Sequence, residues 1–124
     1  MADSEQLRAA VVAYVEASNR NDRDAVLACF APDAVWHDPV GAPPHAGRDA
    51  VGEFWDGTRT MGAITMHLDD VVVCGAEAVA RLRIEAKVGD DTYLMDVIET
   101  FVFDAAGLFT LVKAYWDPAR TRTA

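Results

Sequence analysis

The chain has 124 residues, of which 52% are hydrophobic and 9% aromatic, so it is long and apolar enough to bury a core and is not a disordered tail. Its formal net charge of -9 disfavours nucleic acid and anionic membrane surfaces as partners. This length predicts a single domain over residues 1–124. Because no apolar run approaches a membrane span and no signal-peptide pattern opens the chain, we expect it in the cytoplasm.

The first predicted element is a helix. Its cap is Asp3 or Ser4, and its pattern stops near Asn21. One stripe of this helix is apolar or small, and it consists of Leu7, Ala10, Val11, Tyr14 and Ser18.

Short elements follow. Asp22 can cap a second helix that runs to Phe30 and is ended by Pro32. A brief strand is expected over residues 34–37, and the three prolines of residues 38–44 predict a rigid loop. A third helix is expected roughly over residues 49–58.

The second half of the chain changes to the period of strands. Short turns join the strands, which implies antiparallel neighbours. The four predicted strands are residues 64–73, 77–88, 92–103 and 108–116. Helices followed by such a sheet predict an α+β fold, with three N-terminal helices packed on a curved, mainly antiparallel sheet that leaves a pocket.

One acid interrupts an apolar strand face. Between Tyr93 and Phe103, a period of two places these side chains on one face: Tyr93, Met95, Val97, Glu99, Phe101 and Phe103. Burying an ionised carboxylate there is so costly that the pKa of Glu99 should rise until the group is protonated at neutral pH. A protonated carboxyl in a dry pocket is a hydrogen-bond donor suited to an oxyanion.

The cysteines and histidines predict no site. Cys29 and Cys74 lack CxxC spacing and sit in apolar stretches, so we expect buried reduced thiols and no disulfide. The three histidines, His37, His45 and His67, are too scattered to predict a metal site.

Three segments resemble the active-site segments of the bacterial ketosteroid isomerases. They are residues 13–19 around Tyr14, residues 33–41 with the run Asp38-Pro39-Val40-Gly41, and residues 97–101 around Glu99. The resemblance extends from about Leu7 to Trp116. The ketosteroid isomerases belong to the nuclear transport factor 2-like, or SnoaL-like, superfamily, so the resemblance implies a cystatin-like fold with a conical pocket.

The resemblance also implies roles for three residues. Asp38 matches the family's general base, and Tyr14 matches the tyrosine that donates to the enolate oxygen. Glu99 is in the place of a protonated aspartate that is the second donor. This departure adds a methylene, which moves the donor by about an ångström.

Elementary chemistry agrees with these roles. Moving a double bond from the β,γ to the α,β position of a ketone needs one base that reaches two carbons, and Asp38 can supply it. The enolate oxygen needs oriented donors, which Tyr14 and neutral Glu99 can supply without a metal or organic cofactor. Candidate walls for a flat apolar substrate are Trp36, Phe54, Trp55, Met66, Leu82, Ile84, Phe101, Val112 and Trp116.

Structural interpretations of the same residues remain open. Tyr14 can be a core tyrosine, and Asp38 can begin a turn before its proline. If the register slips by one residue, Glu99 can pair with Arg81 or Arg83.

The same residues are compatible with two other functions. The first is another SnoaL-like pocket enzyme, such as a polyketide cyclase, dehydratase or epoxide hydrolase. An epoxide hydrolase would require Asp96 with Arg81 or Arg83, which alternation places on the wet face. A non-catalytic ligand-binding or dimerisation module is the other. A homodimer is expected for all of these by family analogy.

Overall fold

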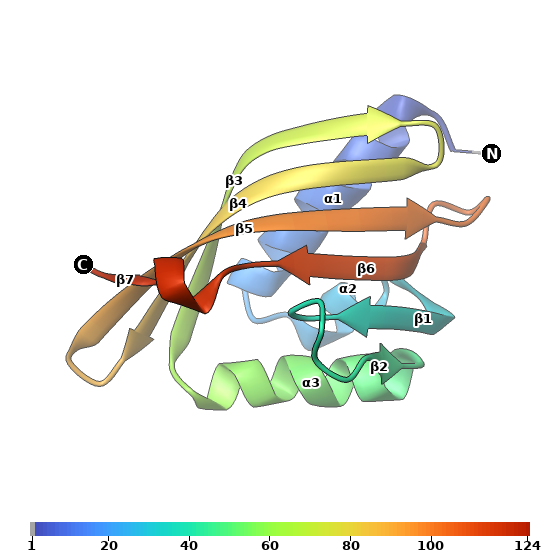
Figure 1. Cartoon of the computed structure of the whole chain (residues 1–124). Helices are drawn as coiled ribbons and strands as arrows, with labels where there is room; N and C mark the ends of the chain where they lie inside the picture. The colour runs from blue at the N-terminus through green and yellow to red at the C-terminus, as the bar shows by residue number, and fades with distance from the viewer. Residues whose placement is uncertain (1) are drawn as a thin grey trace.

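The computed structural model describes residues 2–124, and Figure 1 shows the arrangement of its elements. The helices are α1 (Ser4–Asn19), α2 (Arg23–Leu27) and α3 (Arg48–Thr60), with a 3-10 turn at Pro118–Arg120. The strands are β1 (Phe30–His37), β2 (His45–Ala46), β3 (Ala63–Cys74), β4 (Glu77–Val88), β5 (Asp91–Phe103), β6 (Phe109–Tyr115) and β7 (Arg122–Thr123). The α+β class predicted from the sequence is confirmed.

The first helix begins as its sequence predicts. Asp3 is the N-cap, and its side chain accepts a hydrogen bond from the backbone N–H of Gln6 at 2.9 Å. The Gln6 side chain accepts from the backbone N–H of Asp3 in return, which completes a capping box. The buried stripe of α1 includes Leu7, Val11, Tyr14 and Ser18.

The boundary between the second helix and the first strand was predicted wrongly. Helix α2 ends at Leu27, and Pro32 lies inside β1 instead of terminating the helix. Phe30 is fully buried and pairs with Phe109 of β6, so a distant strand draws this segment into the sheet. Pro32 is tolerated because the pairing of β1 with β6 is irregular between Phe30 and Val35.

The sheet is mixed and does not close. Its order is β2-β1-β6-β5-β4-β3, and β7 pairs with β5. All neighbours are antiparallel except β1 and β6, which are parallel. The two-residue strands β2 and β7 were not predicted, because two residues are too few to show a period.

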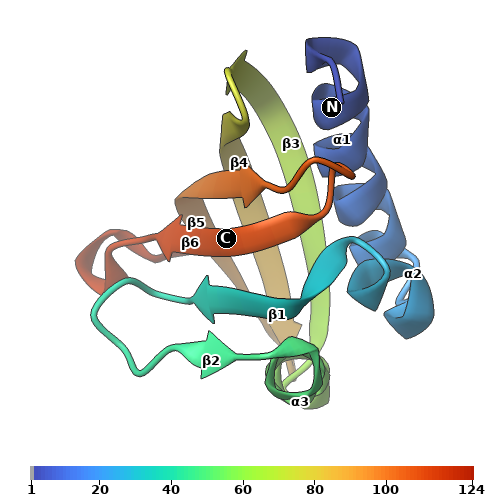
Figure 2. The same cartoon turned by 90° about the vertical axis from the view of Figure 1, so that its right-hand side faces the viewer.

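The curved sheet and the helices enclose the interior (Figure 2). Helix α1 packs along β3 at one edge of the sheet, whereas α3 packs against β1 and β2 at the opposite edge. An aromatic core joins α1 to the sheet, and it contains Tyr14, Phe30, Phe101 and Phe109.

Two smaller findings complete the fold. Cys74 is exposed at the end of β3, contrary to the prediction of a buried thiol, because the outward-facing positions of that strand end contact solvent. Cys29 is half-buried, and both thiols are free. None of the helices within residues 2–124 is both long and apolar enough to cross a membrane.

Candidate active site

A cavity of about 350 Å3 lies between the inner face of the sheet and the helices α1 and α3. Its walls are mostly apolar or aromatic. They are formed by Tyr14, Ser18, Trp36, Asp38, Phe54, Trp55, Thr58, Arg59, Met61, Gly62, Ile64, Met66, Ile84, Ala86, Val88, Met95, Val97, Glu99 and Trp116. Such a lining is typical of a site for a small apolar ligand with a few polar groups.

Asp38 reaches the cavity because two parallel strands end at the same edge of the sheet. It directly follows β1, whose last residue, His37, pairs with Lys113 of β6. The loop after Asp38 is anchored where the Val40 N–H donates to the Ala114 carbonyl at 2.9 Å. Trp116, just beyond the end of β6, donates from Nε1 to Asp38 Oδ1 at 2.9 Å.

Glu99 lies on the inner face of the sheet, with only 3% of its surface exposed. Its neighbours across β4 and β6 are Ala80 and Ala114, which leave room for the carboxyl and offer it no side-chain partner. A register slip would have brought Arg81 or Arg83 opposite Glu99. In the structure, Arg81 lies opposite Ile98 and Arg83 opposite Asp96 across β4 and β5, at outward-facing positions. The interpretation of Glu99 as half of a structural salt bridge is therefore wrong.

Tyr14 lies at the same end of the cavity as the carboxyls of Asp38 and Glu99. Its ring makes edge-on contacts with four aromatic rings at centroid distances of 5.5 to 6.5 Å, from Phe30, Trp36, Phe101 and Phe109. Burial, followed by the negative charges of Glu99 and Asp38, raises the pKa of Tyr14 well above its usual value. Its hydroxyl therefore remains a proton donor across the neutral range.

The two carboxyls have different environments. Burial and, to a smaller extent, the charge of Asp38 raise the pKa of Glu99 from 4.5 to about 8, and hydrogen bonding from Tyr14 opposes the rise. Burial also raises the pKa of Asp38, but the hydrogen bond from Trp116 and the nearby His45 oppose that rise. At neutral pH a proton therefore favours Glu99, and Asp38 is the more acidic of the two carboxyls.

The polar atoms that lack partners are concentrated in this cavity. Within residues 2–124, the buried side-chain nitrogens and oxygens without a hydrogen-bond partner are Trp36 Nε1, Arg59 Nε, Arg59 Nη1 and Glu99 Oε1. All three residues line the cavity. Buried polar groups are normally paired, so this concentration is typical of a site whose ligand supplies the partners.

The structure places most of the residues proposed from the sequence together. Tyr14, Asp38 and Glu99 line one cavity, and so do six of the proposed wall residues, Trp36, Phe54, Trp55, Met66, Ile84 and Trp116.

Three proposed wall residues lie elsewhere. Leu82, Phe101 and Val112 are at most 1% exposed, belong to the core, and are not among the described residues that line the cavity. Phe101 follows Glu99 on the same strand face but packs against Phe109, where the cavity has ended. The period of a strand gives the face of a side chain, but not its position along the pocket.

Arg59, by contrast, was missed. It lies in the last turn of α3, lines the cavity, and its guanidinium lies 4.6 Å from the centroid of the Trp55 ring. The sequence offered only a basic residue near a helix C-terminus, a common surface arrangement.

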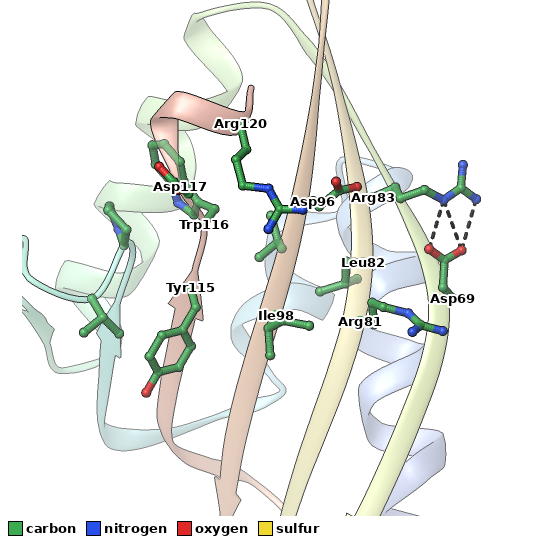
Figure 3. A pocket seen from close by; sticks show the side chains of 13 residues that line it. Asp69, Arg81, Leu82, Arg83, Asp96, Ile98, Tyr115, Trp116, Asp117 and Arg120 are labelled. Atoms are coloured by element: carbon green, nitrogen blue, oxygen red, sulfur yellow. Dashed lines mark hydrogen bonds and ion pairs between the residues drawn. The ribbon is translucent and has the colours of Figure 1, made fainter. Parts of the chain in front are cut away.

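The outer face of the sheet holds a separate groove of about 660 Å3 (Figure 3). Two ion pairs involve residues of this groove: Arg83 contacts Asp69 at 2.9 Å, and Asp96 contacts Arg122 at 2.9 Å. Arg81, Arg83 and Asp96 line this outer groove. They therefore do not form, in the inner cavity, the arrangement of an arginine between two aspartates that an epoxide hydrolase would require. Within residues 2–124, no three His, Cys, Asp or Glu side chains are grouped to hold a metal ion.

Comparison with known proteins gives two relationships in sequence. The SnoaL-like domain family matches residues 11–112. A steroid delta-isomerase from Nocardioides simplex is 34% identical over 115 residues, which are 93% of this chain and 93% of that protein.

Solved structures show the same fold. SalBIII, an epoxide hydrolase/cyclase-like enzyme with a role in pyran ring formation in polyether salinomycin, superposes over 100% of both chains with a TM-score of 0.92 at 19% identity. RV0760c from Mycobacterium tuberculosis does so with a TM-score of 0.89 at 22% identity, again over 100% of both chains. A computationally designed 17-OHP binder gives a TM-score of 0.85 at 22% identity over 96% of each chain. The family match and the isomerase relative together show that this chain belongs to the SnoaL-like domain family.

Proposed function

We propose that this protein is a cofactor-independent steroid delta-isomerase, which moves a C=C bond from the β,γ to the α,β position of a 3-ketosteroid or a similar flat apolar ketone. The observation that carries the proposal is a buried carboxyl of raised pKa, Glu99, beside the phenol of Tyr14, in an apolar cavity that also holds the Asp38 carboxyl. The 34% identity to a steroid delta-isomerase supports the same reaction.

Each residue has a defined part in this reaction. The Asp38 carboxylate removes a proton from the carbon between the carbonyl and the double bond, and the electrons move onto the carbonyl oxygen as a dienolate. Tyr14 and Glu99 donate hydrogen bonds to that oxygen without giving up their protons, since the pKa of each is raised. Asp38 then returns the proton to the γ carbon, which completes the isomerisation within one site.

The first test is turnover of a 5-ene-3-ketosteroid, followed by ultraviolet absorbance of the conjugated enone. Asp38→Asn should lower kcat by roughly a hundredfold to ten-thousandfold, the usual contribution of a general base. Asp33→Asn is the matched control, because it makes the same change at an exposed position of β1, the strand that Asp38 directly follows. Equal rates in wild type and Asp38→Asn would contradict the assignment of the base, and no turnover by folded wild-type protein would contradict the isomerase.

Two wider predictions accompany this function. The homodimer expected by family analogy can be measured by sedimentation, and the cytoplasmic location by fractionation of the source cells. Neither bears on the chemistry of the cavity, which lies within one chain.

A further inference from the structure

Arg59 is a cation in the cavity without an anion beside it. Its Nη2 donates to the Ser18 hydroxyl, and its guanidinium lies over the Trp55 ring. Its Nε and Nη1 are buried and have no acceptor. No carboxylate among residues 2–124 forms a salt bridge with it.

Five of the eight other arginines of this acidic chain have a different environment. They form salt bridges with Asp or Glu at or near the surface: Arg8, Arg20, Arg23, Arg83 and Arg122. Arg59 instead is partly desolvated, and this burial lowers its pKa. A partly buried cation with two unpaired buried donors is costly unless a partner binds it, and Arg59 lines the cavity from which such a partner can reach it.

Arg59 and Glu99 occupy different levels of the cavity. Ser18, which Arg59 contacts, is one helical turn beyond Tyr14, or about 6 Å along α1. Asn19 holds this end of α1 to Met66, with hydrogen bonds of 2.9 and 2.8 Å to its carbonyl and N–H. Met66 lies in one cross-strand row with Ile84 and Met95, which is four residues, about 13 Å, from Glu99 along β5.

We propose that the substrate is a flat apolar ketone that carries a carboxylate at the end remote from the ketone, and that Arg59 binds this carboxylate. The orientation rests on the proposed isomerase, which places the ketone oxygen against Tyr14 and Glu99. The apolar walls between the two ends, including Met66 and Ile84, then cover the rings. Arg59 thereby sets which ketones bind, while the reaction itself takes place at the other end.

The test compares two product-like ligands at equilibrium by calorimetry: a conjugated 3-ketosteroid with a carboxylic acid on its D ring, and the methyl ester of the same acid. Wild type should bind the acid at least about tenfold more tightly, the worth of one charge-assisted hydrogen bond. Arg59→Met should remove this preference by weakening the acid alone, whereas Arg59→Lys should keep part of it. Arg20→Met is the matched control and should behave as wild type, because Arg20 is an exposed arginine at the C-cap of α1.

The ester reports on folding of the variants, because its affinity should not depend on the charge at position 59. If Arg59→Met does not fold, the Arg59→Gln and Arg59→Lys variants give the same comparison. Equal affinity of wild type for acid and ester, or an undiminished preference in Arg59→Met, would overturn the proposal.

The binding test and the turnover test can fail independently of each other. The conjugated ligands need no chemistry, so an Arg59-dependent preference without turnover of any 5-ene-3-ketone would contradict the isomerase and support carboxylate recognition. Turnover of a neutral ketone without an acid preference would support the isomerase and contradict the role of Arg59.

Discussion

Strand β5 presents two acids, Asp96 and Glu99, to opposite faces of the same sheet. They differ in exposure, in hydrogen-bond partners and in the direction in which the pKa is shifted. Asp96 points outward, contacts Arg122 at 2.9 Å, and its pKa is lowered by that hydrogen bond. Glu99, three residues later, points inward, has one oxygen without a partner, and its pKa is raised to about 8. Their positions, more than their residue types, account for this difference.

The comparison separates two ways of placing a carboxylate. On the outer face, water and an arginine both favour the charged form, so the acid is ordinary and serves solubility. On the inner face, Glu99 is only 3% exposed and no arginine among residues 2–124 forms a salt bridge with it, so the carboxyl keeps its proton and becomes a donor. An enzyme that must stabilise an anion uses the second arrangement, at a cost in stability that the outer pair does not incur.

The largest effect expected from this difference is the pH dependence of stability. The folded protein holds the Glu99 proton more tightly than the unfolded chain, so the stabilisation is complete below pH 4.5 and is lost as pH rises to about 8. The loss over this window should be about 5 kcal/mol. Urea unfolding of wild type should show it, and Glu99→Gln, which does not titrate, should reduce the slope sharply.

Asp96→Asn is the control for that experiment, because it removes an acid from the other face of the same strand. Its slope between pH 4.5 and 8 should match that of wild type. Parallel slopes for wild type and Glu99→Gln would contradict a protonated Glu99 in the folded protein.

The next effect is on catalysis. Glu99→Ala removes one donor to the dienolate oxygen and should lower kcat by about a hundredfold to a thousandfold, with a smaller change in KM. Glu99→Asp keeps the acid and should preserve or improve isomerisation. Steady-state rates of the two variants test this, and equal rates for wild type, Asp and Ala would leave Glu99 a structural residue.

A smaller effect concerns the base. Trp116→Phe removes the hydrogen bond of 2.9 Å to Asp38 while keeping an aromatic wall. Because that bond lowers the pKa of Asp38, its loss should move the acidic limb of the kcat/KM profile to higher pH and reduce the rate by roughly tenfold or less. An acidic limb that does not move would show that Trp116 acts only as a wall.

Much of this contrast could be predicted from the sequence. The alternation from Tyr93 to Phe103 placed Glu99 on the apolar face, and the bounds of β4 agreed with those predicted, residues 77–88. Periodicity predicts these strands well because, in a long antiparallel strand with one face in water, polar and apolar side chains alternate over many residues. The same reasoning failed at Pro32, since β1 is formed by pairing with a distant parallel strand.

The parts of the site that could not be predicted depend on distance in space. Arg59 reaches the cavity because α3 crosses near Ser18 of α1, and nothing local to either segment shows that contact. Leu82, Phe101 and Val112 lie on the expected face but beyond the cavity. Where a pocket stops depends on which helices cover the sheet, and strand period does not carry that information.

The smallest effect should come from the outer face. Both side chains of the Asp96–Arg122 pair are about half exposed, at 44% and 51%, so Asp96→Asn should change the free energy of unfolding at neutral pH by an amount near the limit of detection. Because the pKa of Asp96 is lowered, any stabilisation is present above its ordinary value and is lost as pH falls, the reverse of Glu99. The difference between wild type and Asp96→Asn should also shrink in roughly 1 M salt. A large, salt-independent loss at neutral pH would mean that this face is not open to water, and the two faces of β5 would then differ in their partners and not in their solvation.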